Sequence, residues 1–124
     1  MTRSARQLLD EIQAELAPRD GDNRLVPLIT AGRAPRAVFA ALGAEEKLIT
    51  LSDWRSFHAL AARADEPNAR TFFGGLAPGE QQANGMLDSL LAATGPDHGK
   101  ERPRAGCQVY PAYVAWLALN GESS

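Results

Sequence analysis

Apolar residues recur at helical spacing along most of the chain, and the longest such run extends from Pro35 to Ala64. Several of its large apolar residues share one side of a helical wheel: Phe39, Leu42, Ile49, Phe57 and Leu60. Two carboxylates, Glu46 and Asp53, fall on that same side. The pattern therefore predicts a helix that turns two acidic residues toward the interior.

Shorter patterns predict helices on both sides of this run. Ser4 and Gln7 form a capping box before an apolar seam that Pro18 ends, and residues 24–32 suit a short helix. A further helical pattern begins at Pro67 and stops at residues 95–96, and Pro78 either kinks it or starts a new helix. Residues 96–106 are expected to form a mobile loop, followed by a short apolar helix over 107–121. No run alternates with period two, so we expect one all-α domain over residues 1–124, an antiparallel helical bundle with short loops.

Whole-chain quantities favour a soluble cytoplasmic protein. The chain has 124 residues, of which 44% are hydrophobic and 23% charged, with a formal net charge of −2. This charge argues against a nucleic-acid or anionic-membrane surface. Cys107 is the single cysteine, so a reducing compartment fits. Charges throughout the first sixteen residues argue against a signal peptide or a membrane span.

The two carboxylates have structural and functional interpretations. They could lie at the outer edge of the helix or pair with Arg33, Arg36 or Arg55, and Ser52 with Asp53 could cap a helix break. Alternatively they point into a polar pocket between helices. A carboxylate in such a pocket can hold an amine, act as a base or bind a metal, because burial of an isolated charge is very costly.

Other chemistry has little support in the residues. His58 and His98 fit no helical metal-ligand spacing, so no metal site is expected. Cys107 beside an apolar helix is more typical of a small buried hydrophobe than of a nucleophile. The glycine-rich stretch at residues 72–79 lacks the preceding strand and the Lys-Ser/Thr of a phosphate loop. No catalytic residue and no cofactor are predicted.

The stretch from Leu25 to Phe57 resembles the beginning of the TenA/thiaminase II family, which has a heme-oxygenase-like helical fold. Gly32, Pro35 and Phe39 match the family in type and spacing. Seven residues after the Phe, the family places an acidic residue that holds the amine of an aminopyrimidine, and Glu46 occupies that position. The closing stretch at residues 110–118 resembles the Tyr-x-x-Tyr helix that ends the family's first half. The resemblance thus implies Glu46, Tyr110 and Tyr113 as ligand-binding residues, and Asp53 joins them as the second carboxylate on the same side of the helix.

The chain also departs from the family. Family members are much longer, and their catalytic cysteine and second acidic residue follow the Tyr-x-x-Tyr helix. Cys107 precedes that helix, and Leu48 replaces an aromatic residue. Related diiron oxidases have Glu-x6-His where this chain has Glu46-x6-Asp53, and heme oxygenases bind heme through an N-terminal histidine that is missing here. The chain could be a fragment, a half that a second copy completes, or a reduced member that retains only binding.

The sequence therefore predicts half of a heme-oxygenase-like fold that binds a small amine-bearing or aromatic molecule and closes its pocket by forming a homodimer. One alternative is a thiaminase II-like or oxidase enzyme fragment that needs a second half or a partner. The other alternative is a non-catalytic protein–protein interaction module. The exposed apolar patches expected on half a bundle support self-association.

Overall fold

A computed structural model of the chain describes residues 4–19, 21–95 and 102–121, and all regular structure within these ranges is helical. The prediction of an all-α protein is confirmed. The chain divides between residues 34 and 35 into two units, which we describe separately. The prediction of a single domain over residues 1–124 stays a prediction.

The first unit holds two short helices, α1 (Ala5–Glu15) and α2 (Leu25–Thr30), and neither contains a buried residue. The predicted capping box begins α1. Ser4 Oγ accepts from the Gln7 backbone N–H at 3.2 Å, and Gln7 Oε1 accepts from the Ser4 N–H at 2.9 Å. Asn23 Oδ1 accepts two backbone N–H groups at the start of α2. These side chains satisfy N–H groups that a helix leaves without intrahelical partners.

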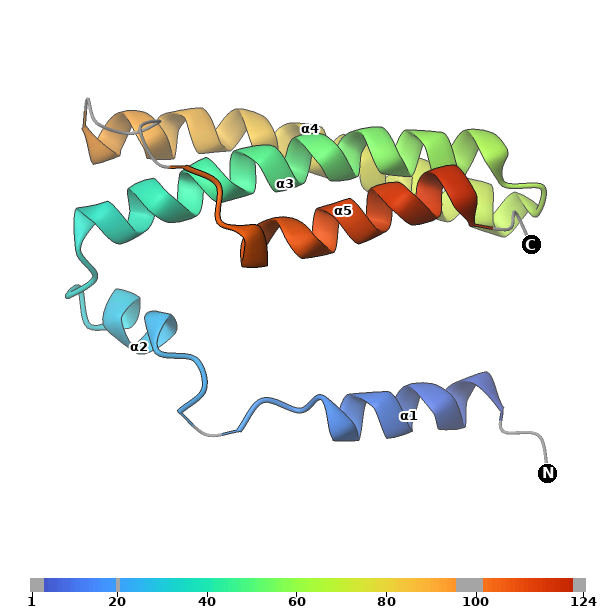
Figure 1. Cartoon of the computed structure of the whole chain (residues 1–124), viewed down its shortest axis with the longest axis horizontal. Coiled ribbons are helices and arrows are strands. Elements are labelled where there is room, and N and C mark those ends of the chain that lie inside the picture. Colours follow the sequence, from blue (N-terminus) through green and yellow to red (C-terminus); the bar gives the residue numbers. More distant parts are fainter. Residues whose placement is uncertain (1–3, 20, 96–101, 122–124) are drawn as a thin grey trace. The chain divides into compact units, whose positions relative to one another are not determined.

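The second unit holds three helices, α3 (Arg36–Arg63), α4 (Pro67–Thr94) and α5 (Ala105–Asn120). Both α4 and α5 pack on α3, and they do not contact each other within the described part of the unit. They lie along different faces of α3, which is the central helix (Figure 1). None of the described helices combines the length and apolar character needed to cross a membrane.

The predicted antiparallel arrangement holds for α4 but not for α5. The N-terminal half of α3 contacts the C-terminal half of α4, since Asn84 Nδ2 donates to Thr50 Oγ1 at 2.7 Å. By contrast, Glu45 contacts the beginning of α5 and Arg63 contacts its end. Because α4 returns the chain to the N-terminal end of α3, α5 enters there and runs parallel to α3 (Figure 1).

Gly43 and Pro78 lie within long helices that continue through both residues. Gly43 lies within α3, and a Cβ there would come within 2.8 Å of Leu91 Cδ2, so the glycine permits close approach of α4. Pro78 lies on an exposed side of α4, and the helix continues through it.

The loop predicted over 96–106 needs correction at its end. Residues 96–101 lie outside the described residues, whereas residues 105–106 form the first turn of α5, and Cys107 lies within that helix. The helix begins earlier than the sequence suggests because the Glu45 side chain accepts the backbone N–H of its N-cap residue, Arg104, at 2.6 Å. This stabilising contact comes from a distant part of the chain.

Small and polar side chains fill the interfaces of the three-helix unit. The buried apolar residues are Ala41, Ala64, Ala77, Leu91, Val114 and Ala118. Four polar residues of α3 are equally buried, namely Glu45, Thr50, Asp53 and Ser56. Small residues let helices approach closely, but they bury little apolar surface. Polar contacts are therefore a large part of what holds α3 to its neighbours.

Candidate functional site

Asp53 is the most deeply buried acidic residue among those described. It lies in the middle of α3 with 3% of its surface exposed. Its Oδ1 atom is buried and accepts no hydrogen bond from any described residue. A buried carboxylate oxygen without a donor is costly, and such orphans in native structures call for an explanation.

The structural interpretations of Asp53 do not fit this placement. Helix α3 runs without a break from Arg36 to Arg63, so Ser52 and Asp53 are not caps. Within the described residues, no arginine or lysine forms an ion pair with Asp53. Asp53 is almost fully buried, so it does not lie on the exposed outer side of the helix.

Burial raises the pKa of Asp53 from 3.8 to about 6, and the charges of Glu80 and Glu46 add to the shift. Glu46 precedes Asp53 by two turns of α3, whereas Glu80 comes from the neighbouring helix α4. Carboxylates from two helices therefore act on Asp53. At neutral pH most Asp53 side chains are still ionised, so the site holds an uncompensated negative charge.

Tyr110 of α5 completes this group. Burial raises the pKa of the Tyr110 phenol, and the charges of Asp53 and Glu80 raise it further. Residues from all three helices of the unit thus contribute to one electrostatic environment. We call Asp53, Glu46, Glu80 and Tyr110 the Asp53 cluster.

The structure brings together three of the four site residues predicted from the sequence. Glu46 is half-buried and acts on Asp53 through its charge. Tyr110 is coupled to Asp53 as well, although 57% of its surface is exposed. Tyr113 is not among the groups that act on Asp53 or Tyr110, and its ring stacks on that of Trp116 with 6.4 Å between ring centroids.

Sequence reasoning missed two acidic residues. Glu80 carried a usable signal, since it lies seven residues from both Phe73 and Leu87 on the apolar side of α4. Glu45 carried none, because its role depends on α5. Its two carboxylate oxygens accept from the Arg104 N–H at 2.6 Å and from Gln108 Nε2 at 2.8 Å.

A polar network fixes α4 against α3 next to the cluster. Lys47 Nζ donates to Asn84 Oδ1 at 3.0 Å and forms an ion pair with Asp88 at 2.7 Å. Asn84 Nδ2 donates to the Lys47 carbonyl at 2.9 Å and to Thr50 Oγ1 at 2.7 Å. These contacts set the register between α3 and α4, on which the effect of the Glu80 charge on Asp53 depends.

The described ranges offer no metal centre. No three His, Cys, Asp or Glu side chains there are grouped closely enough to hold a metal ion. His58 packs edge-on against Trp54, with 5.3 Å between the ring centroids, while His98 lies outside the described residues. Cys107 is free and half-buried in the first turn of α5.

Comparisons with known proteins give no relative. No family model, curated protein or solved structure matches the chain. Function is therefore inferred from the residues of the Asp53 cluster.

Proposed function

We propose that the Asp53 cluster binds a small molecule through a protonated amine. The observation that supports this proposal most directly is the buried Oδ1 atom of Asp53, which has no donor. An ammonium group offers three N–H donors and a positive charge. It would supply the missing hydrogen bond and would offset the repulsion among Asp53, Glu46 and Glu80.

An organic cation fits better than the other ligand classes. Anions are disfavoured by three carboxylates, and the described acidic residues form no group suited to a metal. Tyr110 adds an aromatic ring beside the charges, and aromatic faces attract cations. We therefore expect an amine attached to an apolar or aromatic body.

The resemblance to the TenA/thiaminase II family supports the same ligand class. In that family an acidic residue at the position of Glu46 holds an amine. Membership of the family would also imply a heme-oxygenase-like fold for this chain. Our proposal assigns the main contact to Asp53, because it is the more buried residue and lacks a partner, with Glu46 as a second charge. No catalytic role is proposed for Cys107.

Benzylamine is a suitable probe for this site, with calorimetry or NMR titration as the measurement. Hydrogen bonds to charged groups contribute about 1.5–3 kcal/mol, so Asp53→Asn should weaken binding at least tenfold. Wild-type affinity should also fall about tenfold from pH 7 to pH 5, because a carboxyl with a pKa of about 6 goes from mostly ionised to mostly protonated.

Asp88→Asn is the matched control for this titration. Like Asp53→Asn, this substitution removes one negative charge. The charge comes from α4, where Asp88 is paired with Lys47 outside the Asp53 cluster. We expect affinity within about twofold of wild type, since only long-range screening changes. Equal benzylamine affinity in wild type and Asp53→Asn would refute the amine site.

We further propose that a second copy of the chain covers this side of the unit. Helix α5 has no charged residue between Ala105 and Asn120, yet only part of it packs on α3. Its large exposed side chains are Val109, Tyr110, Tyr113, Trp116 and Leu119. An uncharged surface can pair with a copy of itself around a two-fold axis without charge repulsion. Exposed apolar patches of this kind mark interfaces.

Sedimentation equilibrium tests the association. We expect a dimer at micromolar concentration that buries at least roughly 1,000 Å². Trp116→Glu should shift it to monomer, whereas Gln82→Glu on an exposed side of α4 should not. A wild-type chain that stays monomeric would refute the dimer.

The uncharged surface of α5 favours one second candidate, a protein–protein interaction module. That function requires association through α5 and no ligand in the Asp53 cluster. A dimer that Trp116→Glu disrupts, combined with no benzylamine binding, would support the module over the ligand-binding protein.

A further inference from the structure

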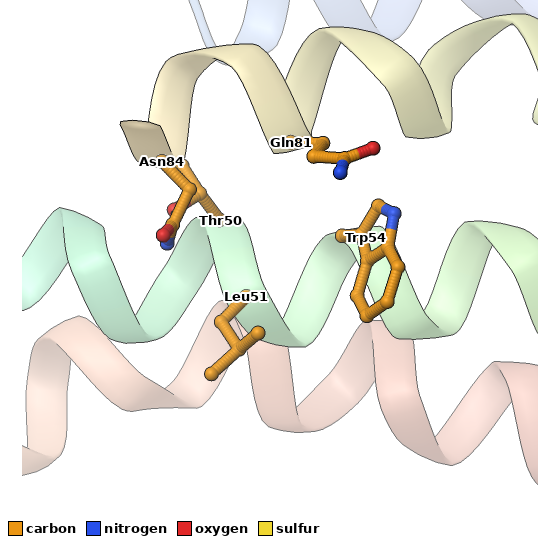
Figure 2. A pocket seen from close by; sticks show the side chains of 5 residues that line it. All are labelled: Thr50, Leu51, Trp54, Gln81 and Asn84. Carbon is orange, nitrogen blue, oxygen red and sulfur yellow. The ribbon is translucent and has the colours of Figure 1, made fainter. Parts of the chain in front are cut away.

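A pocket of about 200 Å³ lies between α3 and α4. Thr50, Leu51 and Trp54 line it from α3, and Gln81 and Asn84 line it from α4 (Figure 2). Gln81 and Leu51 are exposed, so the pocket opens at the surface. Its volume is below the roughly 300–1,000 Å³ of drug-sized ligand pockets, so a ligand of one ring is the size to expect.

Some polar atoms that line the pocket form hydrogen bonds within the protein, and others do not. Asn84 is fully engaged with Lys47 and Thr50, and Thr50 Oγ1 also donates to the Glu46 carbonyl at 2.8 Å. By contrast, the indole Nε1 of Trp54 is buried and finds no acceptor among the described residues. Figure 2 shows the Gln81 amide facing Trp54 across the pocket.

A buried indole N–H without an acceptor is unusual, because tryptophan normally satisfies this donor. The Gln81 amide forms no side-chain hydrogen bond with another described residue, and it can both donate and accept. The pocket thus offers one N–H donor and one primary amide, beside the apolar surfaces of Trp54 and Leu51. None of its lining residues is charged.

We propose that this pocket binds a small neutral molecule with a carbonyl group on a flat ring. The Trp54 N–H donates to the ligand carbonyl, and Gln81 pairs with the remaining polar group of the ligand. The ring lies against the indole, since aromatic pairs favour offset or edge-to-face contact. A charged ligand is disfavoured because no opposite charge lines the pocket to offset its desolvation.

This pocket is separate from the Asp53 cluster. Successive residues of a helix are rotated by roughly 100°. Trp54 therefore points to a different side of α3 from Asp53, and Gln81 to a different side of α4 from Glu80. The two sites also differ in charge, since one holds three carboxylates and the other holds none. They should select different ligands independently.

Titration with benzamide, followed on the indole N–H signal in ¹H–¹⁵N NMR spectra, tests the proposal. The chain has two tryptophans, and a Trp116→Phe spectrum identifies the Trp54 signal. We expect a saturable shift of that signal, with a dissociation constant on the order of millimolar for so small a ligand. Benzoate, which has the same ring and a negative charge, should bind at least fivefold more weakly.

Gln81→Leu and Gln82→Leu form a matched pair of variants. Gln81→Leu removes the pocket amide and should weaken benzamide at least fivefold, whereas Gln82→Leu alters an exposed neighbour and should leave the affinity unchanged. Trp54→Phe keeps a ring but removes the donor, and it should abolish most binding as measured by calorimetry.

Two outcomes would overturn the proposal. One is that the Trp54 indole signal shows no saturable shift up to the solubility limit of benzamide. Water would then be the occupant of the pocket. The other is an equal benzamide affinity in Gln81→Leu and wild type. Benzylamine binding should respond to Asp53→Asn and not to Gln81→Leu, so failure at one site is distinguishable from failure at the other.

Discussion

Glu45 and Asp53 are two almost fully buried carboxylates on the same helix, with opposite surroundings. Glu45 has 6% of its surface exposed and Asp53 has 3%. Both oxygens of Glu45 accept hydrogen bonds from α5, whereas Oδ1 of Asp53 accepts none from the described residues. Burial alone therefore does not distinguish the two carboxylates, but their hydrogen bonds do.

The difference follows from where each carboxylate meets α5. Glu45 meets the beginning of α5, where the first N–H groups have no intrahelical partner and the helix dipole favours negative charge. Asp53 lies near the level of Pro111, whose carbonyl is 3.5 Å from Ser52 Oγ. Backbone N–H groups inside a helix are already paired, and proline has none. Asp53 therefore finds no backbone donor on α5.

Removal of the Glu45 side chain should have the largest effect on stability. Glu45→Ala leaves the first turn of α5 without its acceptor and deletes two hydrogen bonds to a charged group. We expect a loss of about 2–4 kcal/mol in the free energy of unfolding, measured by urea denaturation. Glu46→Ala, at the neighbouring half-buried residue, should change stability by less than about 1 kcal/mol. Equal losses from the two variants would contradict the structural role of Glu45.

Neutralisation of Asp53 should have the opposite sign. Asp53→Asn keeps the shape of the side chain and removes a charge that is buried without compensation. One pKa unit corresponds to about 1.4 kcal/mol, and the shift from 3.8 to about 6 sets an upper bound near 3 kcal/mol. Burial of the asparagine amide costs part of this gain. We therefore expect a gain of about 1–3 kcal/mol in the free energy of unfolding at pH 7. A clear destabilisation in urea at pH 7 would mean that Asp53 has a favourable partner.

The pH dependence of stability should reveal the same carboxyl. The folded pKa of Asp53 is above its unfolded value, so the folded state binds the proton more tightly. The contribution of Asp53 is then favourable at low pH and is lost as the pH rises from about 4 through about 6. Wild type should lose about 1–2 kcal/mol relative to Asp53→Asn between pH 4 and pH 7. Parallel stability curves for the two proteins over this range would argue against a raised pKa.

The sequence predicts the helices of this chain well, because their signals are local. The capping box at Ser4, the first-turn Pro67 and the end of α4 before Gly95 each depend on residues within one turn. The uninterrupted helix across Ser52 and Asp53 was also predicted, and it presents Glu46 and Asp53 on one side of α3. Helical periodicity was sufficient for that result.

The rest depends on contacts between helices, which a local pattern does not contain. The parallel direction of α5 depends on where α4 returns the chain. The start of α5 at Ala105 depends on Glu45, a residue distant in sequence. The periodicity of α3 alone could not assign Glu80 to the cluster, because that pairing needs the register between α3 and α4. The resemblance implied Tyr113 as a ligand-binding residue; its ring stacks on that of Trp116, and its part in binding stays a prediction. Family membership, the ligand and the dimer stay predictions.

The smallest expected effect comes from Glu80, and it tests whether α4 belongs to the site. Glu80→Gln removes one of the two charges that raise the pKa of Asp53, although burial remains the larger cause. The pKa of Asp53 should therefore fall by less than about one unit, and stability at pH 7 should rise by less than about 1 kcal/mol. Carbon-13 NMR titration of the Asp53 carboxyl measures the shift directly. Asp88→Asn removes an equal charge from α4 where Lys47 already pairs with it, so it should leave the Asp53 titration nearly unchanged. An Asp53 midpoint that responds equally to both variants would indicate a general charge effect, and Glu80 would then have no specific place beside Asp53.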